Sequence, residues 1–290
     1  MFHFYLVKSK ICSTLAKILY IMNYQIIPPK DIEECQLFYN AQEKQQIDEI
    51  MNILIPTNYI KILRRLHHFK MKCGMVFLFW GDSGVGKTRL VYEIAKETDR
   101  DVVKSCYNRS RYVGESESQL RRLFEDYDNL VKQYKRAKKN QPILLFDEAD
   151  SIFTKRSKVR HTSDVHENSL QDLLLELVSD NDNRIIFLTT NRLENMDNAF
   201  MRRILYKVKV TAPCQEVRSQ IIHSLFPSLA EDEVASLSEY QMTGANWANV
   251  SQKANINYVI YGEDINIKSL SNYCRQEGNA TKKLQRIGFC

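Results

Sequence analysis

A glycine-rich loop with a single lysine is the part of this sequence with the clearest chemistry. The loop, Gly81-Asp82-Ser83-Gly84-Val85-Gly86-Lys87-Thr88, directly follows an apolar run, Met75–Trp80. Its glycines let backbone N–H groups turn toward phosphate oxygens, while Lys87 offers a mobile positive charge to the terminal phosphates and Thr88 a hydroxyl to Mg²⁺. The sequence therefore predicts a strand, a phosphate-binding loop and then a helix, whose apolar face is formed by Leu90, Val91, Ile94 and Ala95.

Two acids at the end of another apolar run could complete such a site. Ile143–Phe146 has the composition of a buried strand, and Asp147 and Glu148 follow it directly. At a strand tip beside a phosphate loop, Asp147 can hold the Mg²⁺ shell and Glu148 can polarise an attacking water. The alternative is that these acids lie on the surface and cap a helix, a role that we expect of Asp150.

Three further polar residues could act on a phosphate. Asn191 follows the apolar run Ile185–Thr190, where it can orient water or touch the γ-phosphate, or simply form a turn. Arg202 and Arg203 end a short predicted helix. Either they form a salt bridge at the end of that helix, or they supply charge to the γ-phosphate of a neighbouring subunit.

The elements that must position these residues alternate between strands and helices, which predicts a parallel sheet covered on both faces, the α/β class. After Pro213 the apolar residues recur only at helical spacing, so we expect an α/β domain at 38–211 and an all-helical domain at 212–290. Three helices are expected there, around Val217–Leu225, Trp247–Ala254 and Ile267–Cys274. The expected strands are Met75–Trp80, Asp101–Cys106, Ile143–Phe146, Ile185–Thr190 and Leu205–Val210.

Composition limits the class of protein further. The chain has 290 residues and a formal net charge of +6, which is compatible with an acidic ligand without requiring one. Its seven cysteines contain no C-x-x-C pair, which favours reduced thiols in the cytoplasm over disulfides or a metal site.

The first 37 residues are expected to form an N-terminal extension. Met1–Met22 is apolar but contains three lysines, so it fits neither a membrane span nor a secretory signal, and no membrane partner is expected. Two interpretations stay open: a weakly amphipathic helix, or a misassigned start in which residues 1–21 do not belong to the protein and Met22 comes first.

In their order along the chain, these motifs resemble the AAA+ ATPases, and within them the AAA clade proper. The matching segments are GDSGVGKT, ILLFDEAD, the asparagine of TTNR, and MDNAFMRR. Two further segments are similar to AAA motifs: a pore loop at Arg111–Glu117, and Thr243-Gly244-Ala245 in the helical lid. The ends Leu37–Asn40 and Arg286–Phe289 resemble single-module AAA proteins of bacterial type.

The resemblance implies a P-loop NTPase sheet of five strands in the order 5-1-4-3-2, numbered from Met75–Trp80, with a C-terminal all-helical lid. It implies ATP and Mg²⁺ as cofactors and a homo-oligomer, usually a hexameric ring, with nucleotide sites between subunits. Asn191 becomes a sensor residue, Arg202 an arginine finger with Arg203 as its helper, and Gly244 and Ala245 contacts of the nucleotide. Tyr112, Val113 and Gly114 would line a central pore and grip an extended polypeptide.

The sequence does not name the substrate. Protein remodelling driven by ATP hydrolysis is the leading hypothesis. An ATPase that acts on nucleic acid, such as a helicase loader or a mobile-element accessory protein, is the alternative, motivated by Arg121-Arg122 and the basic run Lys132–Lys139. That alternative is disfavoured because exposed basic runs are usually just solvated, and because cations are favoured at a helix C-terminus.

Overall fold

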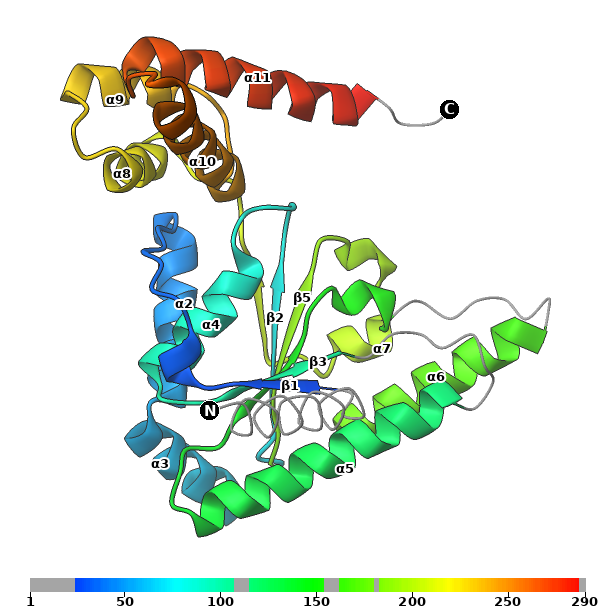
Figure 1. The fold of residues 1–290 in the computed structure, drawn as a ribbon. Coiled ribbons are helices and arrows are strands. Elements are labelled where there is room, and N and C mark those ends of the chain that lie inside the picture. The colour runs from blue at the N-terminus through cyan, green and yellow to red at the C-terminus, as the bar shows by residue number, and fades with distance from the viewer. Residues whose placement is uncertain (1–23, 107–114, 154–161, 180–182, 287–290) are drawn as a thin grey trace, which may run out of the picture. The chain divides into compact units, whose positions relative to one another are not determined.

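The structure is a computed structural model that describes residues 24–106, 115–153, 162–179 and 183–286 (Figure 1). Its elements divide into strands and helices as follows. The strands are β1 Tyr24–Ile27, β2 Met75–Trp80, β3 Val102–Ser105, β4 Ile143–Phe146, β5 Ile185–Thr190 and β6 Tyr206–Lys209. The α-helices are α2 Ala41–Leu54, α3 Pro56–His68, α4 Lys87–Glu97, α5 Glu115–Arg136, α6 Thr162–Ser179, α7 Asn198–Met201, α8 Gln215–Leu225, α9 Glu231–Ser238, α10 Gly244–Tyr261 and α11 Ile267–Arg286. Short 3₁₀ helices are η1 Pro29–Asp31, η2 Ala149–Ser151 and η3 Leu193–Asn195.

The strands form one sheet in the order β1-β3-β4-β5-β2-β6. The pairs β2–β5, β4–β5 and β3–β4 are parallel. Read from β6, the five expected strands follow the order that the resemblance implies, and the α/β class is confirmed. The difference is β1, which pairs antiparallel with β3 at the edge. This strand was not predicted, because its four residues contain no apolar run and two of them are exposed.

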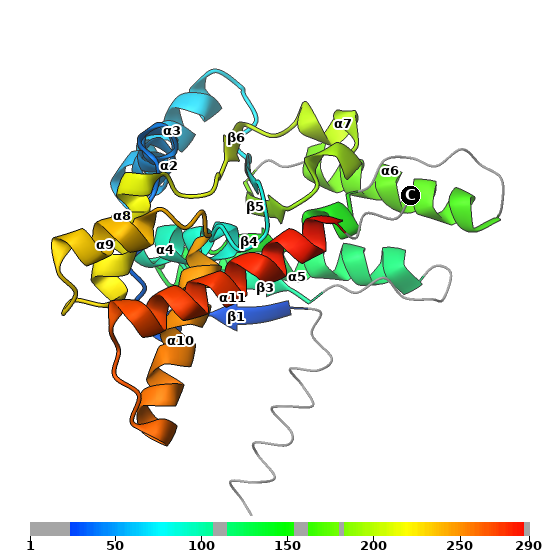
Figure 2. The same ribbon diagram turned by 90° about the horizontal axis from the view of Figure 1, so that it is seen from above.

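Helices cover both faces of the sheet, as the view from above shows (Figure 2). Helices α3 and α4 lie on one side, and α5, α6 and α7 on the other. Strand residues alternate between the two faces, so Val76 and Leu78 enter a core with α5, α6 and α7 while Phe77 faces the other way. There the Phe77 ring stacks on Phe187, with ring centroids 4.7 Å apart. Strands β2 and β5 are therefore held in place by apolar packing.

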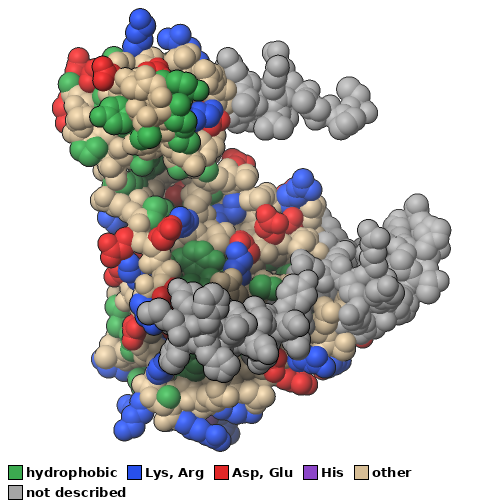
Figure 3. Space-filling model, in the orientation of Figure 1, with side chains coloured by type: hydrophobic (Ala, Val, Ile, Leu, Met, Phe, Trp, Pro, Cys, Tyr) green, Lys and Arg blue, Asp and Glu red, His purple; other side chains and the backbone are tan. Residues whose placement is uncertain are grey.

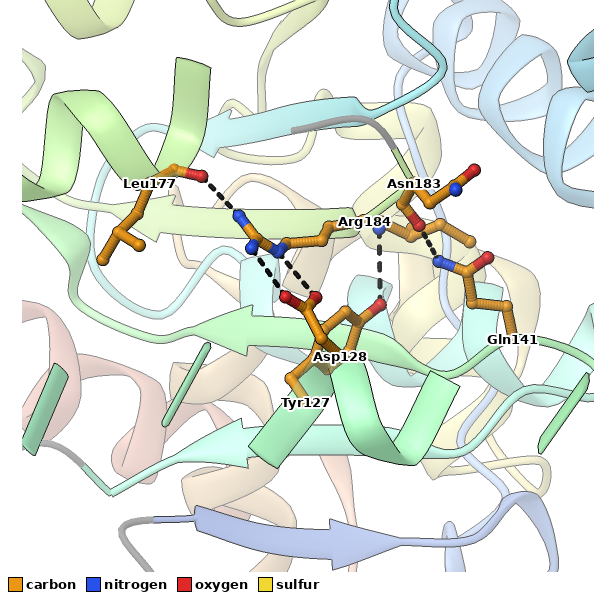
Figure 4. A network of polar contacts seen from close by, with 7 residues as sticks. Tyr127, Asp128, Gln141, Leu177, Asn183 and Arg184 are labelled. Atoms are coloured by element: carbon orange, nitrogen blue, oxygen red, sulfur yellow. Dashed lines mark hydrogen bonds and ion pairs between the residues drawn. The ribbon is translucent and has the colours of Figure 1, made fainter. Parts of the chain in front are cut away.

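Polar contacts from α5 hold the amino ends of β4 and β5 (Figure 4). The Arg184 guanidinium donates two hydrogen bonds to the Asp128 carboxylate, from Nε at 2.8 Å and from Nη2 at 2.7 Å. The Tyr127 hydroxyl donates to the Pro142 carbonyl before β4 and accepts from the Ile185 N–H of β5. Burial raises the pKa of Tyr127 to about 12, so its proton stays in place for this bridge at neutral pH.

The described residues divide into two compact units. The first contains the sheet with α3, α5, α6 and α7, and the second contains the phosphate loop with α8 to α11. In the second unit the three expected helices are present around Trp247, whose side chain is fully buried. Helix α9 was not predicted, because a helix of eight residues shows too few turns for its period to be recognised. The domain boundary between 211 and 212 stays a prediction.

Candidate active site

The phosphate loop adopts backbone conformations that only glycine accommodates well. Gly81, Gly84 and Gly86 all have positive φ, at 147°, 80° and 97°. A Cβ atom on Gly81 would lie 1.9 Å from the Val210 carbonyl oxygen, so no side chain fits there. Gly84 has the next tightest surroundings, because a Cβ there would lie 2.9 Å from the hydroxyl of Thr243. The loop glycines are thus needed for shape and close approach alike.

Lys87 points its ammonium group into this loop. The side chain is 7 % exposed, and Nζ donates to the carbonyls of Gly81 at 2.9 Å and Asp82 at 2.6 Å. These carbonyls fix the ammonium beside the loop's backbone. Thr88 follows in the first turn of α4, where a hydroxyl lies close to any anion that the helix N-terminus attracts.

The lid motif packs directly against the phosphate loop within the second unit. Thr243 is the N-cap of α10, with its hydroxyl accepting from the Asn246 N–H. In the first turn of α10, the Ala245 N–H donates to the Gly84 carbonyl at 3.1 Å. Gly244 and Ala245, the expected nucleotide contacts in the lid, therefore lie beside the loop that would hold the phosphates.

In the first unit, Asp147 is held from two sides at the carboxyl end of β4. Thr189, from the neighbouring strand β5, donates to one carboxylate oxygen at 2.6 Å. Lys104, from β3, donates to the other at 3.0 Å. Burial alone would lower the pKa of Lys104, but the hydrogen bond and charge of Asp147, together with Tyr92, outweigh it and raise that pKa. Lys104 therefore stays charged at neutral pH.

Glu148 sits in a backbone conformation that is unusual for this residue type. Its φ and ψ are 52° and 49°, the left-handed region, at a cost of about 1 kcal/mol. Its N–H donates to the Thr189 hydroxyl at 3.2 Å, which helps to fix this turn, and the side chain is exposed. The turn thus separates the two carboxylates: Asp147 is tethered to the sheet while Glu148 reaches solvent.

The expectation for Asp150 is wrong. Asp150 lies inside η2, and the N-cap of that helix is Glu148. Its carboxylate instead accepts from the Thr190 hydroxyl, at 2.6 Å. Because Thr189 and Thr190 point to opposite faces of β5, they hold Asp147 and Asp150 separately. Neither of the two threonines nor Lys104 was among the predicted site residues, although hydroxyls at the end of an otherwise apolar strand are a visible signal.

The residues expected to sense or stabilise the γ-phosphate differ in their surroundings. Asn191 follows Thr190 at the carboxyl end of β5 and is exposed. Arg203 is tied to its own helix, because one guanidinium nitrogen donates to the Ala199 carbonyl at 2.6 Å and another to the Ser179 hydroxyl. Arg202 is exposed, and its side chain has no hydrogen-bond or ion-pair partner within the described part of the chain. Tyr112, Val113 and Gly114 lie outside the described residues.

The residues present fit a magnesium nucleotide better than a metal held by the protein alone. No group of three His, Cys, Asp or Glu side chains that could hold a metal ion occurs among the residues that the structure describes. Mg²⁺ typically takes one or two protein oxygens and completes its shell with water and phosphate oxygens. The Thr88 hydroxyl and the Asp147 carboxylate supply oxygens of this kind, and their role as ligands stays a prediction.

Comparison with known proteins identifies the family of the segment that contains these residues. The model of the ATPase family associated with various cellular activities (AAA) matches residues 77–212. This segment of the chain is an AAA domain. The matched segment runs from β2 past β6, so it includes the phosphate loop, both acids and the two arginines. The resemblance found in the sequence is confirmed.

Individual relatives agree with this AAA assignment. The chain is 29 % identical over 223 residues to the ATP-dependent zinc metalloprotease FtsH 2 of Thermoanaerobacter sp. (strain X514), which covers 72 % of this chain and 41 % of that protein. It is 33 % identical over 164 residues to the cell division cycle protein 48 homolog of Archaeoglobus fulgidus, covering 53 % and 21 %. The chain thus spans less than half the length of these relatives.

A solved structure shows the same fold. A chain in the structure of the E. coli MS115-1 HORMA:CdnC:Trip13 complex aligns with a TM-score of 0.66 at 17 % identity, over 87 % of this AAA chain and 93 % of that one. Separately, none of the helices in the described ranges is long and apolar enough to span a membrane.

The ion pair between Lys104 and Asp147 predicts a measurable effect on magnesium. Mg²⁺ is expected to raise the affinity for a non-hydrolysable ATP analogue. In a Lys104→Met variant this effect of Mg²⁺ should be about threefold larger than in the wild type, because Asp147 no longer pairs with Lys104. The factor is small because a partly exposed ion pair contributes at most ~1 kcal/mol. The measurement is a titration with a fluorescent analogue, with Mg²⁺ and with EDTA. Lys207→Met, an exposed lysine on β6, is the matched control. A gain equal to that of the wild type would show that Lys104 does not compete with the metal.

Proposed function

We propose that this chain hydrolyses Mg-ATP and that the residues of the phosphate loop and the acids after β4 carry out this reaction. The observation that carries this proposal is the tether between Thr189 and Asp147, which places the carboxylate at the carboxyl end of the sheet. Strand β5 pairs with both β4 and β2, and β2 leads directly into the phosphate loop. Ligands of open parallel sheets bind outside the carboxyl ends of the strands, which supports a nucleotide at this edge of the sheet.

Each side chain then has one role. Lys87 and the loop N–H groups bind the β- and γ-phosphates, while Thr88 and Asp147 hold the magnesium shell. Glu148 orients and deprotonates the attacking water, and its exposed carboxylate leaves room for that water. The bound Mg²⁺ supplies neutralisation of the phosphate charge. Asn191 lies at the end of β5, where it can orient the same water.

The site is completed by a neighbouring copy of the chain. Arg202 is exposed and unpaired among the described residues, so its guanidinium is available to stabilise charge on the γ-phosphate of another subunit. Arg203 supports it by anchoring the end of α7 to Ala199. Such an arrangement requires a closed homo-oligomer, for which we propose a hexameric ring. A cytoplasmic location agrees with the free thiols among the described cysteines.

The proposed substrate is protein. Relatives of the chain include an ATP-dependent metalloprotease and a vesicle-fusing ATPase, from Thermoanaerobacter and Caenorhabditis elegans. Tyr112 and Val113 match the aromatic and aliphatic residues of the family's pore loop. In a ring they would grip an extended polypeptide, and hydrolysis around the ring would pull it through.

A Tyr112→Ala variant tests this threading mechanism. Removal of the gripping ring should abolish ATP-driven unfolding of a green fluorescent protein with an unstructured tail, while basal ATPase activity changes less than about twofold. The readouts are loss of fluorescence and release of phosphate in the same sample. Tyr258→Ala, which removes an exposed tyrosine of α10, is the matched control. Unfolding by the Tyr112 variant at the wild-type rate would exclude threading by this loop.

A further inference from the structure

Two segments of the chain contain many cations and no acids. No Asp or Glu occurs between Glu49 and Asp82, and none occurs between Asp128 and Asp147. The two segments hold five cations each, whereas the whole chain has a net charge of only +6. These cations are Lys61, Arg64, Arg65, Lys70 and Lys72 in the first segment, and Lys132, Lys135, Arg136, Lys138 and Lys139 in the second.

The fold brings both segments to the same edge of the sheet, at the amino ends of the parallel strands. The first segment is α3 with the turn after it, and the second is the end of α5 with its turn. Tyr59 of α3 donates to the side chain of Gln141, at 3.2 Å, and Gln141 lies between the second segment and β4. Lys and Arg side chains gather along the lower edge of the molecule in the space-filling view (Figure 3). We call this surface the basic edge.

The cations of the basic edge are exposed and lie in rows. Lys61, Arg64 and Arg65 have the i, i+3, i+4 spacing that places them on one face of α3, and Lys132, Lys135 and Arg136 repeat it on α5. Each of these rows therefore presents three positive charges on one helix face, where they can contact neighbouring phosphates of a linear polyanion.

Nearby acids do not neutralise these rows. Asp128 is engaged by Arg184, Asp101 accepts from Tyr134, and Asp99 accepts from Asn140. Within the described ranges, no ion pair joins an acid to the nine cations other than Lys72, and Lys72 itself donates to the Ser179 carbonyl. The surface potential of this edge is therefore strongly positive at neutral pH.

Both helices end with a lysine where glycine is usual. Lys70 and Lys138 have φ of 53° and 56°, the left-handed region. Beside each, a hydrogen bond of 2.9 Å closes the last helical turn, from Met71 to Leu66 and from Lys139 to Tyr134. This is the C-terminal motif in which glycine is preferred, and a lysine costs more because of its Cβ. Lys70 and Lys138 thus each place a positive charge at this edge, at a position where glycine would suit the backbone better.

One aromatic ring is presented among these charges. Phe69 is 54 % exposed, and the Arg65 guanidinium lies 4.4 Å from the ring centroid. A ring in such a setting can stack on an unpaired base. A lipid surface fits less well, because an interfacial helix inserts its apolar face. Most apolar side chains of α3 are turned to the protein: Tyr59 is buried and Leu63 and Leu66 are half-buried, while Ile60 is 50 % exposed.

We propose that the basic edge binds single-stranded nucleic acid. The two rows of cations contact successive phosphates, and Phe69 stacks on a base. The site lies at the end of the strands opposite to their carboxyl ends, so it is independent of the nucleotide chemistry. It adds a nucleic-acid contact to the proposed protein remodeller and does not depend on that proposal being correct.

The test uses the two lysines whose replacement should not harm the fold. In a Lys70→Gly, Lys138→Gly double variant, the melting temperature should be unchanged or higher, because glycine suits the left-handed conformation. Binding of a fluorescent single-stranded oligonucleotide should weaken. The slope of log K against log salt should fall by about 1.4, since each phosphate contact on a single strand contributes about 0.7. Saturating ADP keeps the phosphate loop occupied throughout.

Controls and a second variant make the result specific. Lys44→Ala with Lys268→Ala removes the same charge from exposed sites elsewhere, and should leave the slope as in the wild type. Phe69→Ala should weaken binding about tenfold at an unchanged slope, because stacking carries no charge. The proposal is overturned if the wild type binds no oligonucleotide at low salt, if polyglutamate or phosphatidylserine vesicles bind as tightly, or if both double variants lose binding equally.

Discussion

Glu148→Gln is expected to lower the rate of ATP hydrolysis by at least about a hundredfold while ATP remains bound, because general-base catalysis contributes about 10²–10⁴. The substitution removes the group that takes the proton of water but keeps the size of the side chain. The backbone turn should survive, since it is held by the hydrogen bond from the Glu148 N–H to Thr189, which the amide does not alter.

Two measurements check this expectation together. Phosphate release gives the turnover, and filter retention of labelled nucleotide gives its chemical state, which should be ATP in the variant and ADP in the wild type. Glu125→Gln, an exposed glutamate of α5, should behave as the wild type. A Glu148 variant with more than about a tenth of the wild-type turnover would remove Glu148 from the role of base.

Arg202→Ala is expected to have the second large effect, a loss of about 10³ in turnover with nearly unchanged nucleotide affinity, as for arginine fingers in other nucleotide hydrolases. The structural basis is the contrast between two adjacent arginines. The Arg203 guanidinium donates hydrogen bonds to Ala199 and Ser179 of its own chain, whereas Arg202 is exposed and makes no such contact among the described residues. Because Arg202 has no described partner to lose, its replacement should not lower the melting temperature.

The measurement pairs turnover with affinity for an ATP analogue and with thermal melting. Arg275→Ala, an exposed arginine on α11, serves as the control for loss of one positive charge. Arg203→Ala should instead lower the melting temperature, since it removes contacts at the end of α7. If Arg202→Ala hydrolyses ATP at the wild-type rate, charge from this arginine takes no part in the reaction.

The sheet could be predicted from the sequence because its strands are buried on both faces. Runs such as Met75–Trp80 and Ile185–Thr190 are almost entirely apolar. The phosphate-loop motif also identifies the segment before it as a strand. Strand β1 gives no such signal, because an edge strand of four residues with two exposed side chains has the same composition as a loop. Its identity depends on a partner, β3, more than 70 residues later in the chain.

The sequence predicts the chemistry of the candidate site but not the contacts that support it. Lysine, threonine and the two acids are required by phosphate and magnesium, so their types and order suffice to find them. Lys104 and Thr189 act only because β3 and β5 flank β4, and that adjacency is a property of the sheet. Asp150 was assigned to a cap for the same reason: its partner Thr190 lies 40 residues away, where local patterns give no information.

The central claim is that each ATP is hydrolysed by Glu148 of one subunit and Arg202 of the next, and one mixing experiment tests it directly. The Glu148→Gln and Arg202→Ala proteins are each inactive, but an equal mixture should recover about one quarter of the wild-type phosphate release, because random pairing at a head-to-tail interface restores that share of intact sites. A mixture of Arg202→Ala with the double variant provides the control and should stay inactive. Recovery in the first mixture alone is the predicted result; a mixture that forms mixed oligomers yet stays as inactive as its components would contradict the account.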